Sequence, residues 1–72
     1  MITNNYRRDY ESAGGLVTLE VIESDLSGVN VKMMVRYADS RPDKALAVQP
    51  ELTFQQTVIE FDKRFQYEVG RL

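Results

Sequence analysis

The side chains that most often carry acid–base chemistry or bind metal ions are scarce in this sequence. The chain of 72 residues contains no histidine and no cysteine. It therefore lacks the commonest general base near neutral pH and the thiolate ligands of zinc, and it can form no disulfide. A nucleophilic serine or threonine would then need a lysine of lowered pKa as its base. Lys32, Lys44 and Lys63 stand next to charged or exposed positions, and nothing there indicates the desolvation that lowers such a pKa.

Carboxylates are the remaining candidates for acid–base work. Two close pairs occur, Asp9 with Glu11 and Asp39 with Asp43. A pair of carboxylates divides into an acid and a base only where a cleft gives the two groups different pKa values, and a domain this small rarely forms such a cleft. We interpret both pairs as solvated surface charge, and we expect no catalytic residue and no enzyme activity.

Two loop motifs that could bind ions do not have the required pattern. The segment ADSRPD, residues 38–43, lacks the regular acidic alternation and the central glycine of a calcium loop. Gly14 and Gly15 precede an apolar run, whereas a phosphate-binding loop follows a strand and opens a helix. We therefore predict no metal site and no cofactor.

Charge and hydropathy narrow the class of protein. Nine basic residues stand against eleven acidic ones, for a net charge of −2. This balance favours neither a duplex-binding protein, which usually carries a basic face, nor a strongly acidic mimic of nucleic acid. No apolar run reaches the roughly 20 residues that cross a bilayer, and the first residues lack the apolar core of a secretory signal. We expect a cytoplasmic protein with no membrane partner.

Length limits the chain to one small domain, residues 1–72. A domain of this size has a thin stability margin because it buries a small fraction of its surface. With disulfides and thiolate-bound zinc excluded, two sources of extra stability remain: very efficient packing, or burial of apolar surface against another chain.

Two runs of alternating apolar residues predict an antiparallel hairpin over residues 16–37. LVTLEVIE and VNVKMMVRY flank the turn segment SDLSG. A register with Val21 opposite Val31 brings the valines to one face and sets Glu20 opposite Lys32 on the other, and a slip by one residue would destroy both patterns. The loop would have three or five residues, with Gly28 free to adopt a positive φ.

The clearest helical pattern covers residues 53–70. Thr53 followed by Gln56 matches a capping box. Six apolar residues recur at helical spacing and fall in one stripe: Phe54, Val58, Phe61, Phe65, Val69 and Leu72. The valine face of the hairpin is the only surface broad enough to receive this stripe, so we expect the helix to pack there.

The N-terminal segment, residues 1–14, has a weaker pattern. Tyr6, Tyr10 and Ala13 would share one face of a helix, and Gly14 could end it. A short N-terminal helix is our first interpretation, with an ordered tail or a short strand as the alternatives.

Residues 45–49, ALAVQ, predict a short third strand that Pro50 closes. The expected fold class is α+β. An antiparallel hairpin or three-stranded sheet would carry the C-terminal amphipathic helix packed on one face.

The hairpin face turned away from the helix mixes apolar and charged side chains, with Met34 on it among charges. The helix cannot reach this face, so either the N-terminal segment folds across it or another chain does. Interfaces combine aromatic, Met and Arg anchors with a polar rim, although a single exposed methionine is also normal. The exposed hairpin edge offers strand addition as a second mode. We predict six protein-interaction residues: Tyr6, Tyr10, Leu16, Ile22, Met34 and Arg36.

These features favour a small non-enzymatic binding protein. It would act as an inhibitor or adaptor by occupying a surface of a larger protein complex, or it would pair with its own copy as a homodimer. By class analogy alone, such chains include virus-encoded inhibitors of host defence, which act in the host cytoplasm.

Two other classes of function stay open. A nucleic-acid-binding protein could use Arg7, Arg8, Lys32 and Arg36, with tyrosines for base stacking, but neighbouring carboxylates would cancel much of their field. An accessory component of a larger assembly, such as a virion, is the other alternative.

Overall fold

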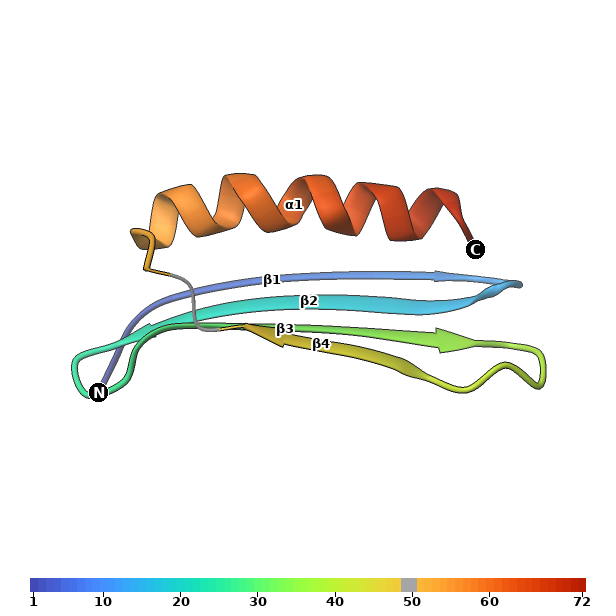
Figure 1. The fold of residues 1–72 in the computed structure, drawn as a ribbon, viewed down its shortest axis with the longest axis horizontal. Coiled ribbons are helices and arrows are strands. Elements are labelled where there is room, and N and C mark those ends of the chain that lie inside the picture. The colour runs from blue at the N-terminus through green and yellow to red at the C-terminus, as the bar shows by residue number, and fades with distance from the viewer. Residues whose placement is uncertain (49–50) are drawn as a thin grey trace.

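The chain forms one antiparallel sheet covered on one face by a helix. The computed structural model describes residues 1–48 and 51–72. In chain order the elements are β1 (Ile2–Ser12), β2 (Gly15–Ser24), β3 (Gly28–Tyr37), β4 (Lys44–Val48) and α1 (Phe54–Gly70). The sheet has four strands in the order β1-β2-β3-β4, and α1 lies along one face (Figure 1). The predicted α+β class is confirmed, with four strands in place of two or three.

The central hairpin has the predicted register. Val21 pairs with Val31 and Glu20 with Lys32, so the large apolar residues of β2 and β3 meet on the face below α1. The loop between the strands has three residues because Ser24 pairs with Gly28. Gly28 has φ 66°, a left-handed conformation that glycine adopts without steric cost.

α1 begins and packs as the sequence predicts. The side-chain oxygen of Thr53 accepts a hydrogen bond from the backbone N–H of Gln56, whose side chain accepts one from the Thr53 N–H, which completes the capping box. Phe61 and Phe65 are 7% and 2% exposed against the valine face, and burial of each ring contributes roughly 2–3 kcal/mol. Thr57 is fully buried, but its hydroxyl donates to the carbonyl oxygen of Thr53 at 2.8 Å.

The predicted N-terminal helix is wrong: these residues form β1, an edge strand paired with β2. A spacing of four puts Tyr6 and Tyr10 on one side of a helix and equally on one side of a strand, where side chains alternate. Only Ala13 distinguished the two patterns, and it lies in the turn between β1 and β2. Ten paired positions along β2 stabilise the strand, whereas a helix of two turns is marginal in water.

The turn between β1 and β2 requires a glycine at its exit. Gly15 has φ 144°, and a Cβ at this position would collide with the carbonyl oxygen of Arg36 on β3. The two glycines after β1 therefore belong to a hairpin turn and not to the end of a helix.

The predicted strand at residues 45–49 is present as β4, which pairs with β3 over residues 44–48. Gln49 and Pro50, the predicted end of that strand, lie outside the described residues. Leu46 faces the core beside Met33, while Ala45 and Ala47 alternate to the opposite side.

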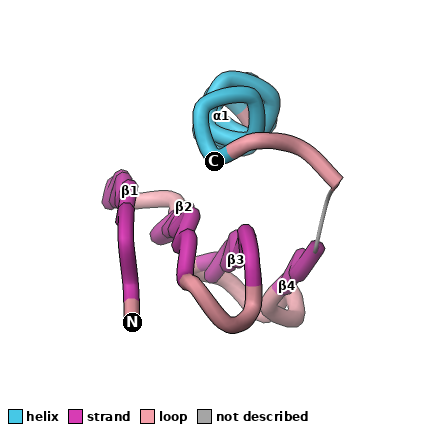
Figure 2. The backbone as a smooth tube through the Cα atoms, turned by 90° about the vertical axis from the view of Figure 1, so that its left-hand side faces the viewer, coloured by secondary structure: helices cyan, strands magenta, loops and turns pink. Residues whose placement is uncertain are grey.

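α1 is held to both sides of the sheet by polar contacts. Asp62 accepts hydrogen bonds from Tyr6 and Arg8 of β1, at 3.2 Å and 2.7 Å. Glu68 pairs with Lys44 of β4 at 3.0 Å. Seen along the strands, α1 lies above the central strands β2 and β3, and β4 lies to one side of α1 (Figure 2). The opposite sheet face has no covering element among the described residues.

Candidate interaction surface

We call the sheet face turned away from α1 the outer face. The strand registers assign its side chains. β1 and β2 contribute Asn5, Arg7, Asp9, Glu11, Leu16, Thr18, Glu20 and Ile22. β3 and β4 contribute Asn30, Lys32, Met34, Arg36, Ala45 and Ala47. The structure therefore brings four of the six predicted interaction residues to one face: Leu16, Ile22, Met34 and Arg36.

A shallow depression of about 260 Å³ lies at the centre of the outer face. Met34 stands between Thr18 on β2 and Ala45 on β4, its cross-strand neighbours. Thr18 lines the depression together with Met34, whose side chain is only half-buried. The lining mixes three cations, one carboxylate and three other side chains: Arg7, Leu16, Thr18, Glu20, Lys32, Met34 and Arg36.

A second, wider depression of about 560 Å³ extends to β4. Ala45 and Ala47 line it on β4, and Ile22 contributes the largest apolar side chain from the outer face. Lys32 and Glu20 line both depressions, so the two hollows share a charged boundary. The outer face is thus a polar surface with a mixed central depression and a more apolar one beside β4.

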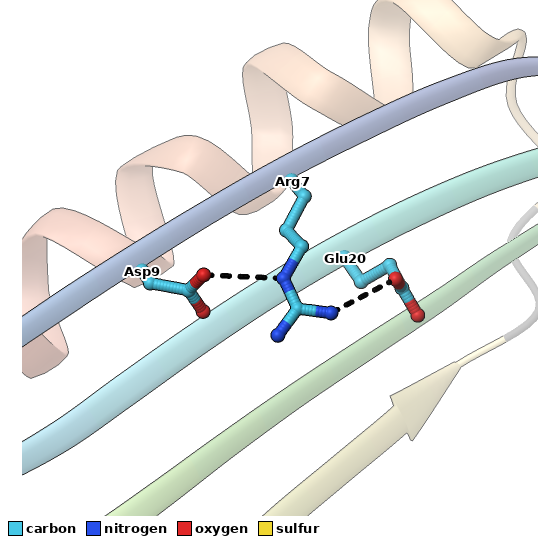
Figure 3. A network of polar contacts seen from close by, with 3 residues as sticks. All are labelled: Arg7, Asp9 and Glu20. Atoms are coloured by element: carbon cyan, nitrogen blue, oxygen red, sulfur yellow. Dashed lines mark hydrogen bonds and ion pairs between the residues drawn. The ribbon is translucent and has the colours of Figure 1, made fainter.

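Three of the six charged side chains assigned to the outer face, all from β1 and β2, pair with one another. Arg7 contacts Asp9 at 3.1 Å and Glu20 at 3.4 Å (Figure 3). Its hydrogen bond with Asp9 raises the pKa of Arg7. A hydrogen bond from Thr18, followed by that from Arg7, lowers the pKa of the Asp9 carboxyl below its usual range. This network fixes the β1 side of the central depression.

The cations on β3 are less constrained. Arg36 lies 3.8 Å from Asp43, at the limit of an ion pair. Lys32 is exposed and forms no ion pair with any described residue. Lys32 and Arg36 are therefore the least engaged cations of the outer face.

The two predicted tyrosines do not belong to this surface. Tyr6 lies on the α1 side, where its hydroxyl donates to Asp62. Tyr10 pairs with Val17, so it is on the same side, 42% exposed near the sheet edge. Arg8 joins them, since it pairs with Asp62 and lies 4.8 Å over the Phe65 ring. The N-terminal segment extends the sheet and does not fold across the outer face.

Sequence reasoning missed the alanine side of the surface. Ala45 and Ala47 flank Leu46, and the alternation of ALA places the leucine toward the core and both alanines outward. Small residues carry little pattern by themselves, so this signal is readable only once the strand is assigned.

Within residues 1–48 and 51–72, no group of side chains is arranged to hold a metal ion. The one helix described there is too short or too polar to cross a membrane.

Comparisons with protein families, with curated proteins and with solved structures find no match for this chain.

Proposed function

We propose that this chain is a small, non-enzymatic protein-binding module. It acts as an inhibitor or adaptor by covering a surface of a larger protein with its outer face. Antiparallel sheets often leave one face to water, and that face is then normally polar. Here Leu16, Ile22 and Met34 interrupt the polar pattern, and all three side chains are half-buried with no covering element among the described residues.

The observation that carries the proposal is the central depression around Met34. Methionine and arginine are enriched in protein interfaces, where a desolvated centre is surrounded by a polar rim. Met34 and Leu16 supply the apolar centre, with cations and a carboxylate around them. A partner with an apolar side chain beside a carboxylate would fill the hollow and pair with Lys32.

Nucleic-acid binding is the weaker candidate. Of the four cations assigned to it, Arg8 lies on the other side of the sheet with Asp62. Arg7 is engaged by two carboxylates. A backbone-binding surface needs cations free to replace counterions, and only Lys32 and the loosely paired Arg36 meet that requirement.

The test compares two variants with the same added charge. Met34→Asp places a carboxylate in the central depression, and Ile59→Asp places one on α1, where Ile59 is 60% exposed. Each tagged protein is used to capture proteins from extracts of the source cells, and captured proteins are compared by mass spectrometry. We expect a partner that binds the wild type and Ile59→Asp and is lost with Met34→Asp.

Folding is checked in parallel by circular dichroism and thermal unfolding, which should be nearly the same for all three proteins. Equal capture of every partner by folded Met34→Asp and by the wild type would contradict the assignment of the outer face.

A further inference from the structure

The two edge strands of the sheet differ in how they are protected against pairing with another chain. Natural edges are shielded by bulges, charges and covering elements. β1 has a register irregularity between Ile2 and Asn4. It also presents charged side chains to both faces, with Arg7 and Asp9 outward and Arg8 toward α1.

β4 has almost none of these features. Its sequence is KALAV, in which Lys44 is the only charged residue and no proline or glycine occurs. The charge of Lys44 is already engaged by Glu68. One side of an edge strand presents unpaired N–H and C=O groups, which can hydrogen-bond to another strand.

The described side chains of β4 are also accessible. Leu46 is only half-buried, and Ala45 and Ala47 are exposed. Figure 2 shows α1 above the central strands and not above β4. An added strand would cover the free side of Leu46.

We propose that β4 is a self-association edge that pairs antiparallel with β4 of a second copy. The two-fold axis passes at Leu46, and the two sheets of four strands join into one continuous sheet. Both copies of α1 then lie on the same side, and the two outer faces form one surface.

Charge favours a second copy in this orientation. Antiparallel pairing centred on Leu46 sets Lys44 opposite Val48 of the second copy and Ala45 opposite its Ala47. The two lysines are then about four residues apart along the strands, roughly 13 Å. Parallel pairing would place one lysine beside the other, and like charges that face each other destabilise strand pairs.

The contact closes after two copies. The free edge of each β4 is paired with that of the other copy. The edges that remain are the two charged, irregular β1 strands. An isologous contact of this kind forms a discrete dimer and not a fibril. Five residues per strand make a contact smaller than the roughly 1,200–2,000 Å² of standard interfaces, so the dimer should exchange with monomer.

Dimerisation would change the surface assigned to partner binding. Each copy would contribute its wider depression. The two depressions would meet at their alanine residues across the dimer axis and form one trough, with Lys32 of each copy along its sides. A partner would then contact two copies at once. This step alone rests on the proposed function; the pairing of β4 does not.

The register can be tested with charges placed across the dimer axis. In the variant Ala45→Lys/Ala47→Lys, a lysine would face a lysine twice, and we expect dimer affinity to fall at least tenfold. In Ala45→Lys/Ala47→Glu, opposite charges would face each other twice, and affinity should equal or exceed that of the wild type. Asn5→Lys adds a charge on β1 and should leave the affinity unchanged. Sedimentation velocity from micromolar to millimolar protein measures all four.

A wild type that stays monomeric over this range overturns the proposal, as does equal dimerisation of a folded Ala45→Lys/Ala47→Lys variant. Should that variant unfold, amide hydrogen exchange of the wild type decides. Exchange at residues 44–47 must slow with rising protein concentration, and exchange independent of concentration contradicts the pairing. Met34→Asp should remain dimeric. If the wild type instead proves monomeric and Met34→Asp still loses the captured partner, the proposed function stands and only the dimer is contradicted.

Discussion

Met33 and Met34 are adjacent in the chain but lie on opposite faces of the sheet. Met33 is 0% exposed between the strands and α1, whereas Met34 is half-buried beside an open depression. The same strand therefore supplies a core residue and a surface residue of identical chemistry. The difference shows that the alternation of the strand and the position of the only described helix decide which apolar side chains are enclosed and which stay accessible.

The largest expected contrast comes from truncating each methionine. Met33→Ala removes a fully enclosed side chain and should lower the free energy of unfolding by about 2–5 kcal/mol. Met34→Ala removes a side chain that water already reaches, and the cost should stay below about 1 kcal/mol. Urea unfolding followed by circular dichroism measures both. Similar losses in the free energy of unfolding for the two variants would show that the Met34 side chain is enclosed in the free protein and not exposed on the outer face.

A second contrast concerns ion pairs on the two faces. Glu68 is 5% exposed and pairs with Lys44 on the α1 side. Lys44→Met would leave that carboxylate buried without its partner, at a cost of about 1–3 kcal/mol. Arg7→Met removes an exposed pair on the outer face, and such pairs contribute little because water screens them. The midpoint of chemical unfolding should fall clearly for Lys44→Met and stay close to the wild-type value for Arg7→Met.

The smallest contrast is in the titration of Asp9. Hydrogen bonds from Thr18 and Arg7 lower the pKa of this carboxyl, so NMR titration should give a midpoint below the usual value for aspartate. Any stability that this network contributes is present above the ordinary pKa and is lost as the pH falls through the lowered one. In Thr18→Val the midpoint should move back up. An unchanged midpoint in that variant would mean that the hydroxyl does not stabilise the charged form.

The central hairpin and the helix could be predicted because their patterns have only one consistent solution. A slip of one residue would move Val21 and Val31 to the wrong face, and the capping box at Thr53 fixes where the helix begins. β1 could not be assigned in the same way. The spacing of Tyr6 and Tyr10 fits a strand and a helix equally, and only pairing with β2 favours the strand.

The residues of the candidate surface could be predicted only where the strand that holds them could be predicted. Leu16, Ile22 and Met34 follow from the hairpin register alone, so they were placed together correctly. The tyrosines depended on β1 and were therefore expected on the wrong side. Ala45 and Ala47 were missed because they matter through their small size, on the side of the second depression where they lie with Lys32.

The most direct test of the outer face as a binding surface uses the methyl signals of the three methionines. In the free protein, a soluble paramagnetic agent should broaden the Met34 methyl signal and leave the Met33 signal sharp. Addition of the partner identified by capture should protect Met34 while Met33 stays unchanged. A Met34 methyl that the agent reaches equally well in the free and the bound protein would contradict the account.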